Sequence, residues 1–137
     1  MLKKSNSEIK NRLSEIGIRP LNHRVAVYRF LLENPIHPTA DEIYAHLKVE
    51  MDSISRTTVY NVLNLLCEHS AIREVAIEKN EMRYDANTAN HIHFKCSVCG
   101  KILDLHSVDF PTIDLPPNFS LEDVQINVTG TCPKCSK

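Results

Sequence analysis

No apolar run in the sequence approaches the roughly 20 residues that a membrane-spanning helix needs, so we expect no membrane-embedded segment. No apolar stretch follows the N-terminal lysines, so we also expect no secretory signal and a cytoplasmic protein. The chain has neither an internal repeat nor a low-complexity tract, and hydrophobic residues make up 42% of it, which excludes wholesale disorder. Its 137 residues suit one mid-sized domain or two small ones.

The sequence also lacks an excess of charge of either sign, since its formal net charge is −1. The distribution is uneven, because residues 1–30 contain seven Lys or Arg residues and only two acidic ones. This local excess of positive charge, which includes Arg19 and Arg24, is a candidate phosphate-facing surface. A solvated helix face would account for the charge equally well.

Apolar residues at helical spacing predict helices over residues 7–16 and 21–33. The segment from Thr39 to Glu42 has the pattern of a capping box, so a third helix is predicted to begin at Thr39. Ser55 is placed to cap a fourth helix, whose apolar residues again recur on one face.

Two short segments, residues 72–77 and 82–85, then predict a β-hairpin. Helices followed by such a hairpin are typical of a winged helix-turn-helix, which we assign to residues 1–85. The small polar residues 86–90 are interpreted as a hinge. Residues 91–137 form a second, small α/β domain, and the fold class is α+β. Strands are predicted there over 91–95, 101–105 and 123–128, and the prolines between the last two limit any helix to a short one.

Four of the five cysteines form two Cys-x-x-Cys pairs, Cys96 with Cys99 and Cys132 with Cys135. Such a turn presents two sulfur atoms at the spacing that tetrahedral Zn²⁺ requires, and two turns complete its coordination. The sequence therefore predicts a structural zinc site that ties the C-terminus to its domain. The alternative, two thiol redox motifs, is disfavoured because no βαβ pattern lies nearby. Cys67 is interpreted as a buried, inert thiol.

Histidines and aspartates suggest a second metal site. His91 and His93 alternate along a predicted strand, so both side chains leave one face of it. Asp104 lies on the next strand, Asp85 ends the hairpin, and His37 lies between two predicted helices. Together they would form a mixed nitrogen and oxygen site suited to Fe²⁺, Mn²⁺ or Zn²⁺. A lone loop histidine such as His37 is more often no ligand at all.

The start of the fourth predicted helix has the character of a recognition helix. Such helices present their N-terminal residues to base edges in the major groove. Arginine reads guanine, asparagine reads adenine, and threonine or tyrosine contacts phosphates or thymine methyl groups. An ordinary amphipathic helix with a polar face is the alternative. The candidate DNA-binding residues here are Arg56, Thr57, Thr58, Tyr60 and Asn61.

From Ile9 to Cys135 the chain resembles the ferric uptake regulator family of bacterial repressors. The motifs that carry the resemblance are Gly17-Ile18-Arg19-Pro20 with Arg24, Pro38-Thr39-Ala40-Asp41-Glu42-Ile43-Tyr44, Ser55-Arg56-Thr57-Thr58-Val59-Tyr60, Arg83-Tyr84-Asp85, and His91-x-His93-x-x-Cys96-x-x-Cys99-Gly100-Lys101.

The resemblance implies a homodimer that binds an inverted-repeat DNA operator when metal is bound. It implies that residues 91–137 are the dimerisation domain and that the four cysteines hold the structural Zn²⁺. A regulatory Fe²⁺ or Mn²⁺ is implied between the two domains. Its implied ligands are His37, Asp85, His91, His93 and Asp104.

Within the family, the chain is most similar to the peroxide-sensing branch. Asp85 and Asp104 stand where iron-responsive members commonly carry Glu, and Asn61 stands where they commonly carry Arg. The extra metal site of many members also lacks convincing ligands here. The chain departs from the family over residues 109–118, where a helix is usual and this sequence is short and rich in proline.

We therefore expect a metal-dependent DNA-binding repressor that senses peroxide through Fe²⁺-catalysed oxidation of His37 or His91. A repressor that responds to iron or zinc without peroxide chemistry is the alternative. A metalloenzyme is disfavoured because no general base lies beside an open metal position. A zinc-ribbon adaptor would leave the helix-turn-helix signal unused.

Overall fold

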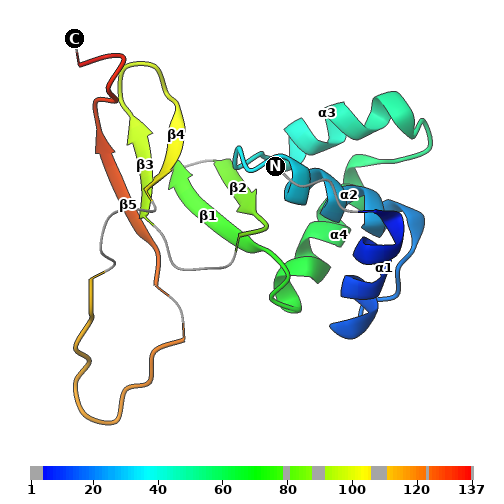
Figure 1. Ribbon diagram of the computed structural model, residues 1–137, viewed down its shortest axis with the longest axis horizontal. Helices are drawn as coiled ribbons and strands as arrows, with labels where there is room; N and C mark the ends of the chain where they lie inside the picture. Colours follow the sequence, from blue (N-terminus) through cyan, green and yellow to red (C-terminus); the bar gives the residue numbers. More distant parts are fainter. Residues whose placement is uncertain (1–4, 79–80, 88–91, 106–110, 123, 137) are drawn as a thin grey trace. The chain divides into compact units, whose positions relative to one another are not determined.

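The computed structural model describes residues 5–78, 81–87, 92–105, 111–122 and 124–136 (Figure 1). The chain divides into two compact units, Met1–Thr88 and Ala89–Lys137. Residues 88–90 of the predicted hinge lie outside the described residues, so the hinge stays a prediction. No helix in the described ranges has the length and apolar character needed to cross a membrane.

Four helices form the first unit, and side chains cap three of them. They are α1 (Asn6–Glu15), α2 (Asn22–Glu33), α3 (Ala40–Glu50) and α4 (Arg56–Glu68). Ser5 accepts a hydrogen bond from the Glu8 N–H, and Ser55 accepts one from the Thr58 N–H. Thr39 forms the predicted capping box with Glu42. The predicted helices are thus confirmed to within one residue, because the caps that mark their starts are visible in the sequence.

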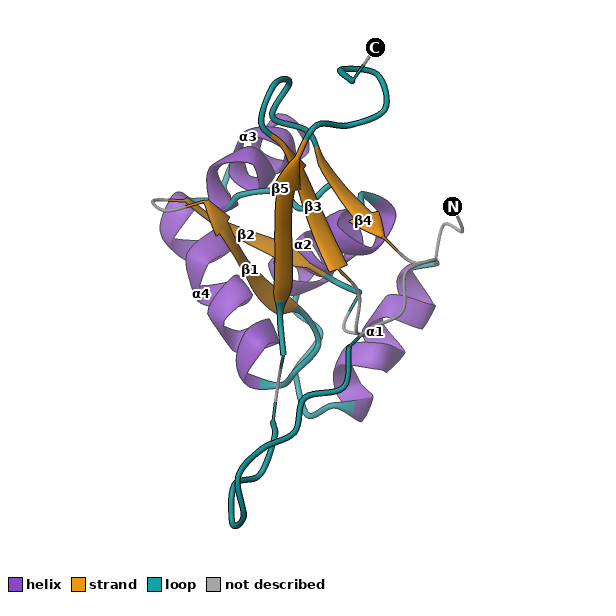
Figure 2. Cartoon of the chain, turned by 90° about the vertical axis from the view of Figure 1, so that its left-hand side faces the viewer, coloured by secondary structure: helices purple, strands orange, loops and turns teal. Residues whose placement is uncertain are grey.

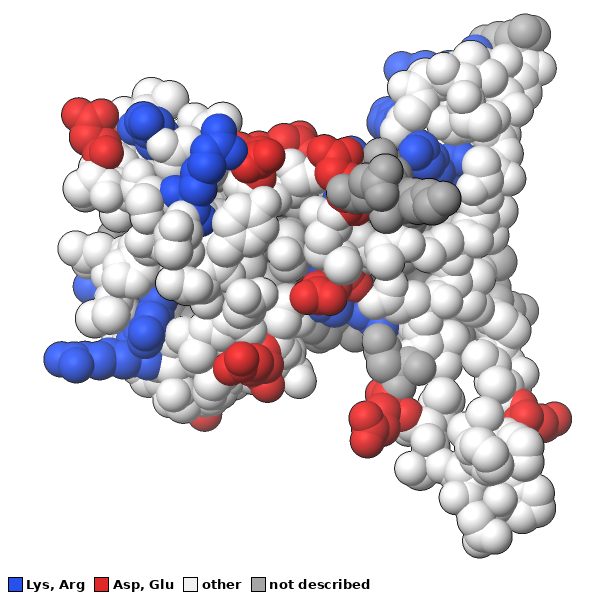
Figure 3. Space-filling view, turned by 180° about the vertical axis from the view of Figure 1, so that it is seen from behind, with Lys and Arg blue, Asp and Glu red and all other residues white. Residues whose placement is uncertain are grey.

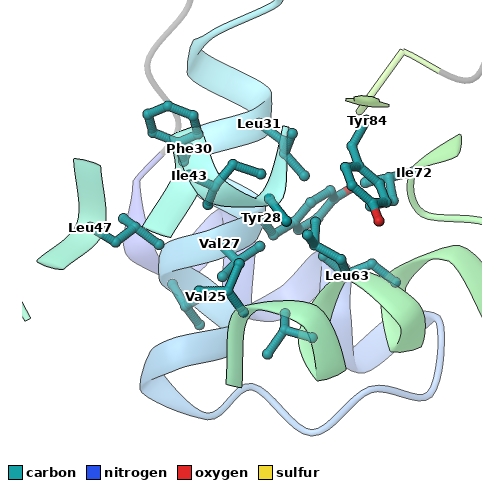
Figure 4. Close-up of a cluster of buried hydrophobic side chains, with 14 of the residues drawn as sticks. Val25, Val27, Tyr28, Phe30, Leu31, Ile43, Leu47, Leu63, Ile72 and Tyr84 are labelled. Atoms are coloured by element: carbon teal, nitrogen blue, oxygen red, sulfur yellow. The ribbon is translucent and has the colours of Figure 1, made fainter. Parts of the chain in front are cut away.

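The hydrophobic core of this unit lies among the four helices (Figure 4). Leu31 of α2, Ile43 of α3 and Leu63 of α4 are all at most 2% exposed. Tyr84, from the following hairpin, packs against the same cluster. Full burial of a side chain such as leucine contributes about 1.5–3 kcal/mol. This core packs α2, α3 and α4 against one another.

The wing is the antiparallel hairpin of β1 (Arg73–Glu78) and β2 (Glu81–Asp85). It is joined to the segment that precedes α3, because the Tyr84 N–H donates to the Pro38 carbonyl at 3.0 Å and Thr39 bridges to Arg83. Helices followed by a hairpin confirm the winged helix-turn-helix.

A three-stranded sheet forms the second unit (Figure 2). Its strands are β3 (Ile92–Cys96), β4 (Ile102–Leu105) and β5 (Ile126–Gly130), in the order β4-β3-β5. β4 is antiparallel to β3, whereas β5 is parallel to it. The α+β fold class is thereby confirmed.

β4 ends and β5 begins at the same edge of the sheet, because Leu105 and Ile126 both pair with Ile92, and the connection between them has to pass β3. Residues 111–122 of this connection contain neither helix nor strand. Pro111, Pro116 and Pro117 explain this, since proline lacks the N–H that a helix interior or a strand ladder needs. The last strand was predicted to begin at residue 123, but it begins at Ile126, and that prediction was wrong by three residues.

Candidate metal centres and candidate DNA-binding helix

The parallel pairing of β3 with β5 brings the two Cys-x-x-Cys turns together. Because parallel strands end at the same edge of a sheet, the turn after β3 and the turn after β5 lie side by side. The register pairs Cys96 with Gly130, and the Ser97 N–H donates to the Gly130 carbonyl at 2.8 Å. Gly100 closes the first turn with a φ of 76°, a left-handed conformation that a Cβ would disfavour.

The four sulfur atoms form one compact cluster. Sulfur atoms of Cys96, Cys99, Cys132 and Cys135 all lie within 4.8 Å of one another. The Sγ atoms of Cys99 and Cys132 are 3.9 Å apart. A tetrahedral zinc site with Zn–S bonds of about 2.3 Å would separate its sulfurs by about 3.8 Å. The donor chemistry and the spacing both fit Zn²⁺.

Backbone amides favour a thiolate at Cys96. The N–H of Cys99 and the N–H of Cys132 lie 3.5 Å and 3.4 Å from its Sγ atom. These hydrogen bonds lower the pKa of Cys96 to about 6. The pKa of Cys135 is raised to about 12, first by its hydrogen bond with the Cys132 side chain and then by desolvation. A thiolate is the form of cysteine that binds a metal ion, so the amides around Cys96 favour ligation.

The first unit holds a buried histidine and aspartate pair. His37 lies in the turn between α2 and α3, and Asp85 ends β2. The His37 Nε2 atom is 3.3 Å from the Asp85 Oδ2 atom, and the two residues are 1% and 3% exposed. The Asn87 N–H donates to the other carboxylate oxygen at 2.9 Å, which fixes the orientation of Asp85.

The second unit holds a similar pair. His93 on β3 and Asp104 on β4 are direct cross-strand neighbours. The His93 Nδ1 atom is 3.0 Å from the Asp104 Oδ1 atom, and His93 is 1% exposed. A carboxylate at Nδ1 sets the tautomer so that Nε2 carries the lone pair that binds a metal.

Both pairs fit the donor set expected for a regulatory ion. Imidazole and carboxylate together suit Fe²⁺, Mn²⁺ and Zn²⁺. Buried charged groups are costly unless they are paired or bound to a cation. The fifth predicted ligand, His91, lies outside the described residues and stays a prediction.

The N-terminal part of α4 presents the polar face that the sequence predicts. Thr57, Tyr60 and Asn61 are exposed, and Thr58 is half-buried. Arg56 is exposed as well, but it forms an ion pair with Asp41 of α3. This pair was not anticipated, because it joins residues 15 positions apart.

Arg19 and Arg24 lie just before and within the first turn of α2. The Arg24 Nη1 atom donates to the Arg19 carbonyl at 3.1 Å. Arg24 also lines a cleft shared with Thr58 and Asn61 of α4. On the face drawn in Figure 3, basic side chains are interspersed with acidic ones. Its position next to α4, more than net charge, makes Arg24 a candidate DNA contact, and Arg19 stays a prediction from the sequence.

The sequence analysis names Arg83 only as part of a motif and assigns it no role, whereas in the structure it contacts the His37 turn. Its Nη1 atom donates to the His37 carbonyl at 2.9 Å and lies 3.4 Å from the Glu42 carboxylate. Glu42 was visible as part of a capping box, but nothing in the local sequence predicts its distant arginine partner.

Comparison with known proteins places the chain in one family. The sequence model described as the ferric uptake regulator family matches residues 15–129. The peroxide-responsive repressor PerR of Staphylococcus epidermidis is 33% identical over 132 residues, covering 91% of this chain and 86% of that protein. PerR of Staphylococcus aureus is 33% identical over 127 residues, covering 90% of this chain and 86% of that protein.

Solved structures agree on the fold. The ferric uptake regulator of Helicobacter pylori, described as having three functional metal-binding sites, matches with a TM-score of 0.72 at 20% identity, over 100% of this chain and 97% of that one. PerR of Streptococcus pyogenes, described as a peroxide sensor, matches with a TM-score of 0.55 at 25% identity, over 96% of this chain and 93% of that one. The chain therefore belongs to the ferric uptake regulator family, whose members are metal-responsive transcriptional repressors, and it is a regulator and not an enzyme.

Proposed function

We propose that the chain is a dimeric repressor that binds an inverted-repeat operator while a regulatory ion is bound and that releases it when peroxide oxidises a ligand histidine. The single observation that carries this proposal is a buried histidine and aspartate pair in each unit. His37 lies 3.3 Å from Asp85 in one unit, and His93 lies 3.0 Å from Asp104 in the other.

The two pairs are proposed to serve one ion, with His91 as the fifth ligand. An ion that takes ligands from both units couples the two units. Binding of the ion then favours one arrangement of the units, and loss of the ion allows others. Residues 86–90 are proposed as the hinge through which this happens. The ion is proposed to be Fe²⁺ or Mn²⁺, because both accept mixed imidazole and carboxylate ligands.

DNA binding is assigned to the exposed face of α4. In a two-fold dimer, two such helices enter successive major grooves about 34 Å apart. Tyr60, Asn61 and the threonines at the start of α4 are proposed to contact bases or phosphates, and Arg19 and Arg24 to contact the DNA backbone.

The cysteine cluster has a separate, structural role in this proposal. Four sulfur ligands fill a tetrahedral coordination sphere and leave no open position for chemistry. The zinc therefore joins the ends of β3 and β5 and stabilises the dimerisation domain.

The signal is proposed to be peroxide, as the names of the relatives suggest. Bound Fe²⁺ supplies the reductive activation of peroxide close to its ligands. The imidazole of His37 or His91 gains one oxygen atom, and the second peroxide oxygen leaves as water, so the ring is oxidised by two electrons and the peroxide is reduced by two. An oxidised ring is a poorer nitrogen donor, and operator affinity falls with ion affinity.

Mass spectrometry of the Fe²⁺-loaded and Mn²⁺-loaded protein after dilute peroxide tests this function. We expect a gain of one oxygen on the peptide with His37 or His91 in the Fe²⁺ form only, in step with operator release. The Mn²⁺ form is the control, because that ion reacts poorly with peroxide. Unmodified histidines, with operator binding restored by adding metal, would favour the second candidate, a repressor that responds to the metal level alone.

A third outcome would assign the response to the zinc site instead. Oxidation at the four cysteines with loss of zinc would place the sensor there, although filled tetrahedral thiolate sites are usually slow to react.

A further inference from the structure

Arg83 connects the turn that carries His37 with the N-terminus of α3. Its guanidinium donates to the His37 carbonyl at 2.9 Å and lies 3.4 Å from Glu42. The same Glu42 oxygen accepts the Thr39 N–H at 3.1 Å, so one carboxylate serves both the helix cap and the arginine. The Arg83 side chain is 18% exposed, which makes it one of the better shielded arginines of the unit.

We propose that Arg83 is a positioning residue that holds the His37 turn in the conformation needed for ion binding. This inference rests on the proposed function, in which His37 and Asp85 are ligands. Arg83 and Asp85 are two positions apart on β2 and therefore leave the same face of that strand. β2 thus supplies both the ligand Asp85 and Arg83, the residue that positions the other ligand, His37.

The His37 turn needs such support because its backbone is in an unfavourable conformation. His37 has a φ of 57°, in the left-handed region that residues with a Cβ rarely adopt. Pro38 follows it, and the residue before a proline is normally extended. The positive φ and the following proline both disfavour this backbone conformation, so it persists only when contacts with the surrounding residues stabilise it. The hydrogen bonds from Arg83 to His37 and from the Tyr84 N–H to Pro38 do this.

The charge of Arg83 is compatible with a nearby cation. Glu42 lies 3.4 Å away and Glu81 lies 3.8 Å away, so two carboxylates offset the guanidinium. The arginine also delivers its hydrogen bond to a carbonyl oxygen and not to an imidazole nitrogen. It therefore shapes the turn without competing with the ion for the ring.

The test measures Mn²⁺ affinity in the full-length, zinc-loaded dimer. Removal of groups that orient metal ligands typically lowers affinity 10- to 100-fold. We expect Arg83→Ala to raise the Kd for Mn²⁺ by that factor and to change the visible absorption of the Co²⁺ form. Arg83→Lys should restore part of the affinity, since an ammonium can still donate one hydrogen bond but cannot span both acceptors. Zinc content should stay at one per chain, and Arg12→Ala, at an exposed arginine of α1, is the matched control.

A second measurement needs no regulatory ion. Hydrogen exchange in the zinc-only protein should be faster over residues 37–44 and at Tyr84 in Arg83→Ala than in the wild type or in Arg12→Ala. If Arg83→Ala does not fold, Glu42→Gln provides the same test, because it keeps an oxygen for the Thr39 cap and removes the charge that holds the arginine. Unchanged exchange together with unchanged Mn²⁺ affinity would overturn the positioning role. If the wild type binds no Mn²⁺ but the exchange result holds, the proposed function fails and the structural role of Arg83 stands.

Discussion

Arg56, the first residue of α4, forms an ion pair with Asp41 near the start of α3. Its guanidinium also lies over the Tyr44 ring, 4.7 Å from the ring centre. The sequence analysis predicts that Arg56 contacts DNA bases, and in the structure its guanidinium contacts Asp41 and Tyr44 of α3. Both side chains of the ion pair are more than 60% exposed, so the arginine stays accessible to water and to other anions.

We predict that Asp41→Asn strengthens binding to random DNA and leaves stability nearly unchanged. Exposed ion pairs contribute only about 0–1 kcal/mol, so the melting temperature should move little. The substitution removes a negative charge beside the DNA and frees Arg56 to contact a phosphate. One added phosphate contact steepens the dependence of log K on log salt concentration by about 0.9.

Fluorescence anisotropy with random DNA over a salt series measures this slope. Glu50→Gln, at the other end of α3, removes the same charge away from Arg56 and should leave the slope unchanged. Equal slopes for Asp41→Asn and the wild type would mean that Arg56 does not approach the phosphates.

A second prediction concerns the exposed residues of α4. Tyr60 is 45% exposed, and Asn61 follows it on the polar face. Tyr60→Ala should weaken operator binding without loss of the dimer. Asn61→Arg should change operator preference more than affinity for bulk DNA, because arginine pairs with guanine where asparagine pairs with adenine. Competition between operator and random DNA measures both effects, and parallel changes would remove position 61 from the base-reading set.

Local patterns account for the parts of the fold that were predicted well. The caps at Thr39 and Ser55 are short-range signals, and each helix begins within one residue of its predicted start. The two Cys-x-x-Cys turns were equally clear, because each turn sets the spacing of its own two sulfurs.

Long-range pairings account for what was missed. The contacts of Arg83 with His37, 46 positions away, and of Arg56 with Asp41 depend on how the elements pack. The late start of β5 follows from its parallel register with β3, which places Ile126 opposite Ile92. No periodicity within the segment itself encodes that register.

A third prediction concerns the zinc. Cys96→Ser and Cys132→Ser should each reduce bound zinc from one per chain to near zero. Because structural zinc supplies folding free energy directly, the second unit should unfold and the protein should become monomeric. Cys67→Ser is the control, because Cys67 lies in α4 and outside the sulfur cluster. This variant protein should keep its zinc. Zinc analysis and sedimentation measure the outcome, and a zinc-free variant that stays a folded dimer would contradict the structural role.

A fourth prediction concerns Cys67 itself. Burial, assisted by the charge of Glu74, raises the pKa of its thiol from 9.0 to about 11. At pH 8 the native protein should therefore contain roughly 100-fold less thiolate at Cys67 than an unperturbed cysteine, and alkylation should be correspondingly slow. The neutral thiol is favoured in the folded state, so its contribution to stability is fully present below pH 9 and is lost as the pH rises toward 11.

Alkylation rates by mass spectrometry at several pH values test this. Denatured protein provides the unperturbed rate for the same peptide. Equal rates in the native and denatured protein at pH 8 would show that Cys67 is not shielded.

A fifth prediction concerns the pair in the sheet of the second unit. Asp104 accepts from His93 across the β3–β4 pair at 3.0 Å, and this contact fixes the ring. Asp104→Asn keeps the shape of the side chain but offers either an amide oxygen or an NH₂ group at Oδ1, and it carries no charge. We therefore expect Mn²⁺ affinity to fall at least 10- to 100-fold, because the substitution removes a charged ligand that is also the carboxylate partner of a ligating histidine. His93→Ala should also lower the affinity, because it removes the imidazole ligand of the same pair. Thr129→Ala, at an exposed position on β5 of the same sheet, should leave the affinity unchanged.

Titration of the zinc-loaded dimer with Mn²⁺, followed by electron paramagnetic resonance, ranks the three variants by their Mn²⁺ affinity. If Asp104→Asn binds Mn²⁺ as tightly as Thr129→Ala, this pair does not belong to the regulatory site, and the ion must take its ligands elsewhere.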